Sequence, residues 1–98
     1  MDDPSTAAVL TRNEQAGRYE LALDGELVAV AHFVEQGELT IVPHTEVSPT
    51  RRGQGIGAVL VGAVLDDLRQ RGHRVEPQCW YVQEFIDLHP EYSELLAR

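Results

Sequence analysis

The sequence contains no lysine; its positive charge comes from eight arginines, against sixteen aspartates and glutamates. The resulting net charge of −8 argues against nucleic acid or an anionic membrane as a partner, because both attract an excess of lysine and arginine. The missing lysine also excludes a P-loop nucleotide site, whose Gly-Lys pair contacts the phosphates. We therefore expect no nucleic-acid partner and no membrane partner.

Cysteines and long apolar runs are equally scarce. Cys79 is the single cysteine, so no internal disulfide can form and a reducing, cytoplasmic location is expected. The longest apolar run, residues 56–65, is shorter than the roughly 20 residues that span a bilayer. No Cys/His spacing suggests a metal. Residues 1–6 lack an apolar signal core and are expected to be a flexible terminus, followed by one domain over residues 7–98.

Alternating apolar residues and turn signals predict strands in the first half of the chain. Asp24-Gly25 is typical of a hairpin turn, because both turn positions must tolerate a positive φ. In the fourth strand, Leu39, Ile41 and Val47 are expected to share one face, and Pro43 is expected to cause an irregularity. The strands are expected over residues 8–12, 19–23, 27–34 and 38–47.

The second half changes to helical spacing. Apolar residues predict a helix over residues 56–71 that ends at Gly72. A short strand is expected over residues 74–80, then a helix from Val82 that Pro90 ends. The order is β-β-β-β-α-β-α, with a right-handed crossover between the fourth and fifth strands. The fold class is therefore α+β, with a mixed, mostly antiparallel sheet.

Residues 49–57 join a strand to the start of the helix expected over residues 56–71, and they predict an anion site. A helix start leaves backbone N–H groups without partners and carries a partial positive charge. No acidic residue occurs between Glu46 and Asp66, whereas Arg51 and Arg52 stand beside three glycines that allow close approach of a ligand. This is the build of a phosphate or pyrophosphate site. The alternative is a glycine-rich turn with two solvated arginines.

The same residues also match the sequence pattern of a dinucleotide-binding loop. Gly53-x-Gly55-x-x-Ala58 matches the Rossmann fingerprint, and Glu76 lies near the expected ribose-binding acid. Two observations disfavour it: residues 48–52 separate the strand from the first glycine, and the preceding strands look like hairpins rather than a parallel βαβ unit.

The same loop resembles the GNAT acyltransferases. Arg52-Gly53-Gln54-Gly55-Ile56-Gly57 fits their Arg/Gln-x-x-Gly-x-Gly/Ala signature. Together with residues 44–47, 77–82 and 89–92, it is similar to a subfamily of very short GNAT-like proteins, over residues 8–96. The resemblance implies a GNAT-like three-layer α/β/α fold. It also implies that the two helices walling the acceptor site in larger members are absent.

The resemblance implies a set of site residues for acetyl-CoA or CoA. The loop would hold the pyrophosphate, and the fourth strand would splay from the fifth to receive the pantetheine, with the N–H near Val47 facing the thioester carbonyl. The implied cofactor-binding residues are Val47, Arg51, Arg52, Gly53, Gln54, Gly55, Ile56, Gly57 and Tyr81.

Three residues are candidates for the chemistry. Glu46 and His44 share a strand face and are candidate general bases; the alternative for both is a solvent-facing polar residue. Cys79 is a candidate acyl carrier, proton donor or packing residue. We expect direct transfer, because no cation near Cys79 in the sequence would lower its pKa. Trp80 is assigned a packing role.

Three functions follow, in decreasing order of support. The first is an acetyl-CoA-dependent N-acetyltransferase acting on an unidentified small-molecule or peptide amine. The second is a non-catalytic acyl-CoA-binding module. The third is a truncated dinucleotide-binding domain.

Overall fold

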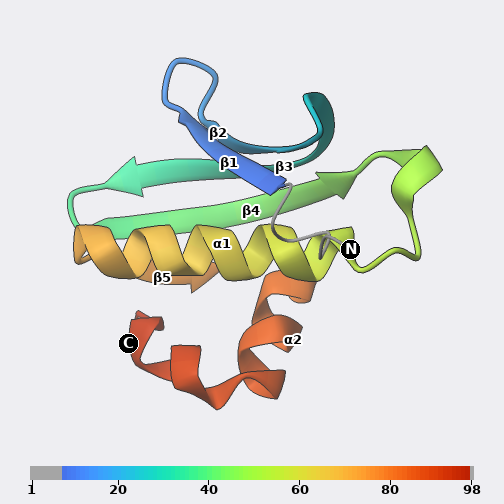
Figure 1. Cartoon of the computed structure of the whole chain (residues 1–98). Helices are drawn as coiled ribbons and strands as arrows, with labels where there is room; N and C mark the ends of the chain where they lie inside the picture. Colours follow the sequence, from blue (N-terminus) through green and yellow to red (C-terminus); the bar gives the residue numbers. More distant parts are fainter. Residues whose placement is uncertain (1–7, 98) are drawn as a thin grey trace.

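A computed structural model describes residues 8–97 as a five-stranded sheet with helices packed against it (Figure 1). The sheet order follows the sequence, β1-β2-β3-β4-β5. The elements are β1 (Ala8–Asn13), β2 (Arg18–Leu23), β3 (Glu26–Gln36), β4 (Leu39–Val47), the 3-10 helix η2 (Pro49–Arg51), α1 (Ile56–Arg71), β5 (Arg74–Pro77), α2 (Trp80–Leu88) and the 3-10 segment η3 (Pro90–Leu95).

Short turns make the first four strands antiparallel, whereas α1 makes β5 parallel to β4. The turn between β2 and β3 has two residues, Asp24 and Gly25, with φ of 50° and 84°. Such positive φ values suit the twist of a hairpin, as the Asp-Gly pair predicts. The expected α+β class and element order are confirmed.

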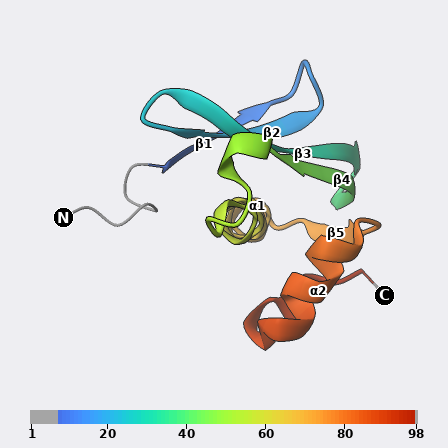
Figure 2. The same ribbon diagram turned by 90° about the vertical axis from the view of Figure 1, so that its right-hand side faces the viewer.

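The long helix α1 covers the sheet with an apolar stripe. Ile56, Leu60, Val64 and Leu68 recur at helical spacing and are buried. The helix ends at Gly72, whose φ of 74° and amide bonded to the Arg69 carbonyl form the expected C-cap. Both α1 and α2 lie on the same side of the sheet (Figure 2).

The strand β4 changes face at Pro43. Thr40 and Val42 are buried, whereas Leu39 and Ile41 are only partly buried on the other face. The register with β3 shifts opposite this proline, which cannot donate a ladder hydrogen bond. The irregularity expected at Pro43 is confirmed, but the expectation that Leu39 and Ile41 share a face with Val47 was wrong.

The strand β5 is shorter than expected. Its parallel ladder ends at the pair Val42 and Pro77, and the amides of Gln78 and Cys79 both donate to the Val42 carbonyl at 3.1 Å. Since α2 already begins at Trp80, the expected strand through residue 80 was wrong, and Cys79 is the N-cap of a helix. The strand β4 thus continues beyond the end of its neighbour, which opens a gap between them.

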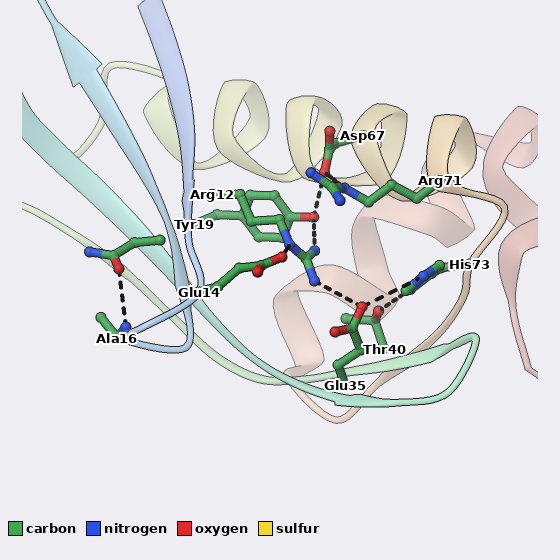
Figure 3. Close-up of polar contacts among 10 residues, drawn as sticks. Arg12, Glu14, Ala16, Tyr19, Glu35, Thr40, Asp67, Arg71 and His73 are labelled. Carbon is green, nitrogen blue, oxygen red and sulfur yellow. Dashed lines mark hydrogen bonds and ion pairs between the residues drawn. The ribbon is translucent and has the colours of Figure 1, made fainter.

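A polar network ties the other end of α1 to the sheet (Figure 3). The Arg12 side chain is 6% exposed, and its guanidinium lies 4.3 Å from the ring centre of Phe33. It donates to the Tyr19 hydroxyl at 2.6 Å and to Glu35 at 3.0 Å, while the Tyr19 hydroxyl donates to Asp67 on α1 at 2.6 Å. Burial and the bond to Asp67 raise the pKa of Tyr19 to about 12, so the hydroxyl remains a donor.

We predict that Tyr19→Phe lowers the free energy of unfolding by about 1–3 kcal/mol, because it removes two hydrogen bonds to charged groups, Arg12 and Asp67, in a partly buried site. Urea unfolding followed by circular dichroism measures the change. Tyr92→Phe is the matched control, since it removes a hydroxyl bond to Asp66 at the exposed surface. An equal loss in both variants would contradict the special role of the network.

Candidate functional site

A cleft of about 690 Å³ opens where β4 extends beyond the end of β5. Its walls come from the end of β4, from the loop that leads into α1, and from the first turn of α2. These three segments meet at one end of the molecule (Figure 2). The cleft therefore joins the glycine-rich loop to Cys79, two features separated by more than twenty residues in the sequence.

Two glycines shape the loop before α1. Gly53 and Gly55 have φ of 82° and 76°, a region that favours glycine. Gly55 is the N-cap of α1, which has no side-chain cap and no acidic residue in its first turn. The first backbone N–H groups of a 16-residue helix thus face the cleft region without the usual oxygen partner. Such a helix start favours a bound anion.

The two arginines of the loop differ in their partners. Arg51 forms an ion pair with Glu26 at 2.8 Å, which ties the loop to the start of β3. Within residues 8–97, Arg52 has no carboxylate partner, and it lines the cleft beside Gly53. Arg52 is therefore the better placed of the two to neutralise a bound anion.

Gly57 serves a different purpose from the other loop glycines. A Cβ at this position would lie 2.9 Å from the Tyr81 hydroxyl oxygen and 3.1 Å from two carbons of its ring. The missing side chain thus lets α2 bring Tyr81 against the start of α1. Burial and the charge of Glu84 raise the pKa of Tyr81, so its hydroxyl is protonated at neutral pH.

Cys79 lines the same cleft as the glycine loop, at the start of α2. Partial burial alone would raise the pKa of its thiol, but hydrogen bonding from Thr45 and from the backbone amides of Val82 and Tyr81 outweighs burial and lowers it. The Thr45 hydroxyl oxygen lies 3.5 Å from the sulfur. A helix start thus supplies the stabilisation that no nearby cation provides.

The two candidate bases lie together, but not equally near the cleft. The Glu46 carboxylate lies 3.3 Å from His32 Nε2 and 3.4 Å from His44 Nε2. His44 lines the cleft, whereas Glu46 does not and lines a separate hollow of about 180 Å³ beside Pro49. Glu46 is therefore placed to contact His44 rather than a group inside the cleft.

The cleft gathers most residues expected from the sequence. Gln54 and Glu46 do not line it, and Thr45 and Trp80 line it although neither was singled out as a site residue. Trp80 is 73% exposed, so its assignment to packing was wrong. The expected site residues that line the cleft are His44, Val47, Arg51, Arg52, Gly53, Gly55, Ile56, Gly57, Cys79 and Tyr81.

Residues 8–97 contain neither a metal-binding cluster nor a helix that could span a membrane. No group of three His, Cys, Asp or Glu side chains in this part of the chain is arranged to hold a metal ion. None of the helices there has the length and hydrophobicity needed to cross a bilayer.

Comparison with known proteins gives relatives along the whole chain. The chain is 29% identical to Protein NATD1 of Xenopus tropicalis over 98 residues, which covers 96% of this chain and 90% of that protein. It is 40% identical to Protein NATD1 of Bos taurus over 55 residues, covering 54% of this chain and 49% of the relative.

Solved structures share the fold at low identity. A GCN5-like protein from Staphylococcus aureus superposes with a TM-score of 0.69 at 17% identity, over 94% of this chain and 90% of that chain. N-acetylglutamate synthase from Neisseria gonorrhoeae, complexed with coenzyme A and N-acetyl-glutamate, gives a TM-score of 0.55 at 21% identity. The match covers 74% of this chain and 19% of that chain. The family model described as GCN5-related N-acetyl-transferase matches residues 18–95, which include β2 to β5, the glycine loop and both α-helices. The chain thus belongs to the GCN5-related N-acetyltransferase family.

Proposed function

We propose that the protein is an acetyl-CoA-dependent N-acetyltransferase. The observation that carries this proposal is a cleft lined both by the uncapped start of α1 with Arg52 and by Cys79. The uncapped start of α1 and Arg52 suit a pyrophosphate, and the gap beyond β5 suits the extended pantetheine arm. A neighbour that shares the fold is itself described in complex with coenzyme A.

Acetyl transfer requires bond exchange at the thioester carbon and movement of two protons. The nitrogen of a neutral amine forms a bond to the acyl carbon, the carbon–sulfur bond breaks, and the sulfur leaves as a thiolate that must gain a proton. We assign removal of the amine proton to His44, with Glu46 holding its ring. We assign stabilisation of the carbonyl oxygen to a backbone N–H near Val47, on the part of β4 beyond β5.

Two other functions compete with this proposal. A non-catalytic acyl-CoA-binding module would keep the anion site and lack turnover; the lowered pKa of Cys79 favours an enzyme. A dinucleotide-binding domain would need parallel strands before the loop, whereas β1 to β4 are antiparallel.

We predict that acetyl-CoA and CoA raise the melting temperature, whereas NAD and ATP do not, because a ligand that binds only the folded state stabilises it. Arg52→Ala should weaken CoA binding roughly 10- to 100-fold, the value of one charge-assisted contact. Titration calorimetry measures the affinity. Arg69→Ala is the control for lost charge, because Arg69 pairs with Glu94 near the far end of α1. Unchanged affinity in Arg52→Ala would refute the pyrophosphate site.

Turnover separates the enzyme from the binding module. Incubation of the protein with acetyl-CoA and a set of amines should release CoA, which a thiol reagent detects. Binding of acetyl-CoA without release of CoA to any amine would support the non-catalytic module instead.

A further inference from the structure

A narrow apolar void adjoins the cleft at Thr45, which lines both spaces. The other residues around the void are apolar and buried, namely Ala31, Val42, Val61, Val64, Leu65 and Val82. The void is too narrow to hold a water molecule. The Thr45 side chain therefore separates a cleft that is open to solvent from a dry space in the core.

The elements that form the cleft continue into this void. On α1, Val61 lies four residues after Gly57, which lines the cleft, and is thus about one helical turn further along. On α2, Val82 lies three residues after Cys79. The void is the next layer of side chains behind the cleft wall.

The space exists because β3 places small residues beside the end of β4. Ala31 pairs with Thr45, and Ala29 pairs with Val47. Paired residues of antiparallel strands lie side by side on one face of the sheet. Both alanines are buried, and Ala31 lines the void together with residues of α1. A methyl side chain at position 31 leaves unfilled the volume that a larger residue would occupy.

The proposed chemistry brings the acyl group next to Thr45. In it, the thioester sulfur lies toward Cys79, and the carbonyl oxygen lies toward the N–H near Val47, on the part of β4 beyond β5. Thr45 precedes Val47 by two residues on the same strand, and its hydroxyl oxygen lies 3.5 Å from Cys79 Sγ. The remaining substituent of the acyl carbon is its alkyl chain, which therefore meets Thr45.

Resting on the proposed function, we infer that Thr45 limits the donor to an acetyl group, and that the void behind it is a latent site for longer acyl chains. The methyl of an acetyl group ends at the Thr45 side chain. The additional methylene of a propionyl group requires the space that this side chain fills. One methylene that a pocket does not fit changes kcat/KM by about 10- to 200-fold.

Thr45→Ser opens the passage and keeps the hydroxyl that contacts Cys79. The wild-type protein should prefer acetyl-CoA to propionyl-CoA by about 10-fold or more in kcat/KM, and Thr45→Ser should reduce this preference to about threefold or less. Thr40→Ser is the matched control, because Thr40 is a buried threonine of the same strand that lines neither the cleft nor the void. The control should keep the wild-type preference.

The role of the void is tested by changing its walls in the Thr45→Ser background. Val61→Ala removes two carbon atoms from the α1 side and should extend use of the donor to butyryl-CoA. Ala31→Val fills the void and should restore rejection of propionyl-CoA. Val75→Ala controls for general loosening, since Val75 is a buried valine of β5 outside the void. Urea unfolding shows which variants are folded, and Val61→Ala still tests the void if the overpacked Ala31→Val does not fold.

Calorimetric titration provides a readout that needs no turnover. The wild-type protein should bind propionyl-CoA about 10-fold more weakly than acetyl-CoA, whereas Thr45→Ser should bind the two about equally. Equal use of both donors by the wild type, or an unchanged preference in Thr45→Ser, would overturn the inference while acetyl transfer stands. If acyl-CoA binds but no amine is acylated, the proposed enzyme fails, and the binding ratios alone decide whether Thr45 limits the acyl chain. If no acyl-CoA binds, the proposed function and the inference fail together.

Discussion

Gly55→Val is expected to abolish CoA binding while the protein still folds. Gly55 has φ of 76°, a conformation that a β-branched side chain strongly disfavours. An added Cβ meets no atom within 4 Å, so the variant loses about 1–2 kcal/mol to backbone strain rather than to a clash. The same valine projects from the N-cap of α1, where it hinders approach of a pyrophosphate to the first N–H groups.

Gly37→Val separates strain from ligand binding. Gly37 has φ of 62°, an added Cβ there also meets nothing within 4 Å, and it lies in the turn between β3 and β4, away from the cleft. Both variants should lose similar stability in urea unfolding. Only Gly55→Val should lose the rise in melting temperature caused by CoA. If folded Gly55→Val binds CoA with unchanged affinity, the loop glycines serve the turn alone.

Much of the fold could be predicted from local patterns. The Asp24-Gly25 turn and the helix that ends at Gly72 depend on neighbouring residues in the sequence, so their signals were sufficient. The faces of β4 were not predictable in the same way. The alternation of Leu39 and Ile41 suggested one face, but the shift at Pro43 and the packing against α1 bury Thr40 and Val42 instead.

The glycine loop of the site was predictable from the sequence, whereas the surroundings of Cys79 were less so. The glycines, Arg52 and the absence of acids marked the anion site within a few adjacent residues. Thr45 and Trp80 carried no such signal in the sequence. They line the cleft only because β5 ends at Pro77, so that β4 extends beyond it and α2 begins nearby. Treating residues 74–80 as one strand hid the fact that Cys79 caps a helix.

That misplaced boundary bears on the mechanism. Direct transfer was expected partly because no cation near Cys79 in the sequence would lower the pKa of its thiol. The start of α2 and Thr45 lower it instead, which removes that reason. Both a nucleophilic thiolate and a proton donor to the departing CoA sulfur now fit the position of Cys79 in the cleft.

Thr45→Val tests the source of the lowered pKa. It removes the hydroxyl nearest the sulfur, so the pKa of the thiol should rise. The pH dependence of alkylation by iodoacetamide reports this directly, because Cys79 is the only thiol in the chain. An unchanged alkylation profile would show that the backbone amides alone set the pKa.

Cys79→Ala is expected to lower turnover by about 10²–10⁴, the usual contribution of a positioned proton donor, and to leave CoA affinity within a few-fold of wild type. Intact-protein mass spectrometry after incubation with acetyl-CoA then distinguishes the two roles. As a nucleophile, the thiolate bonds to the acyl carbon, the CoA sulfur leaves, and an amine later displaces Cys79; one hydroxylamine-labile acetyl group should accumulate. As a proton donor, Cys79 acquires no acetyl group. The chain has no lysine, so a hydroxylamine-resistant acetyl group on an amine can only mark the N-terminus. Near-wild-type turnover in Cys79→Ala would exclude both roles and leave the thiol as a packing residue.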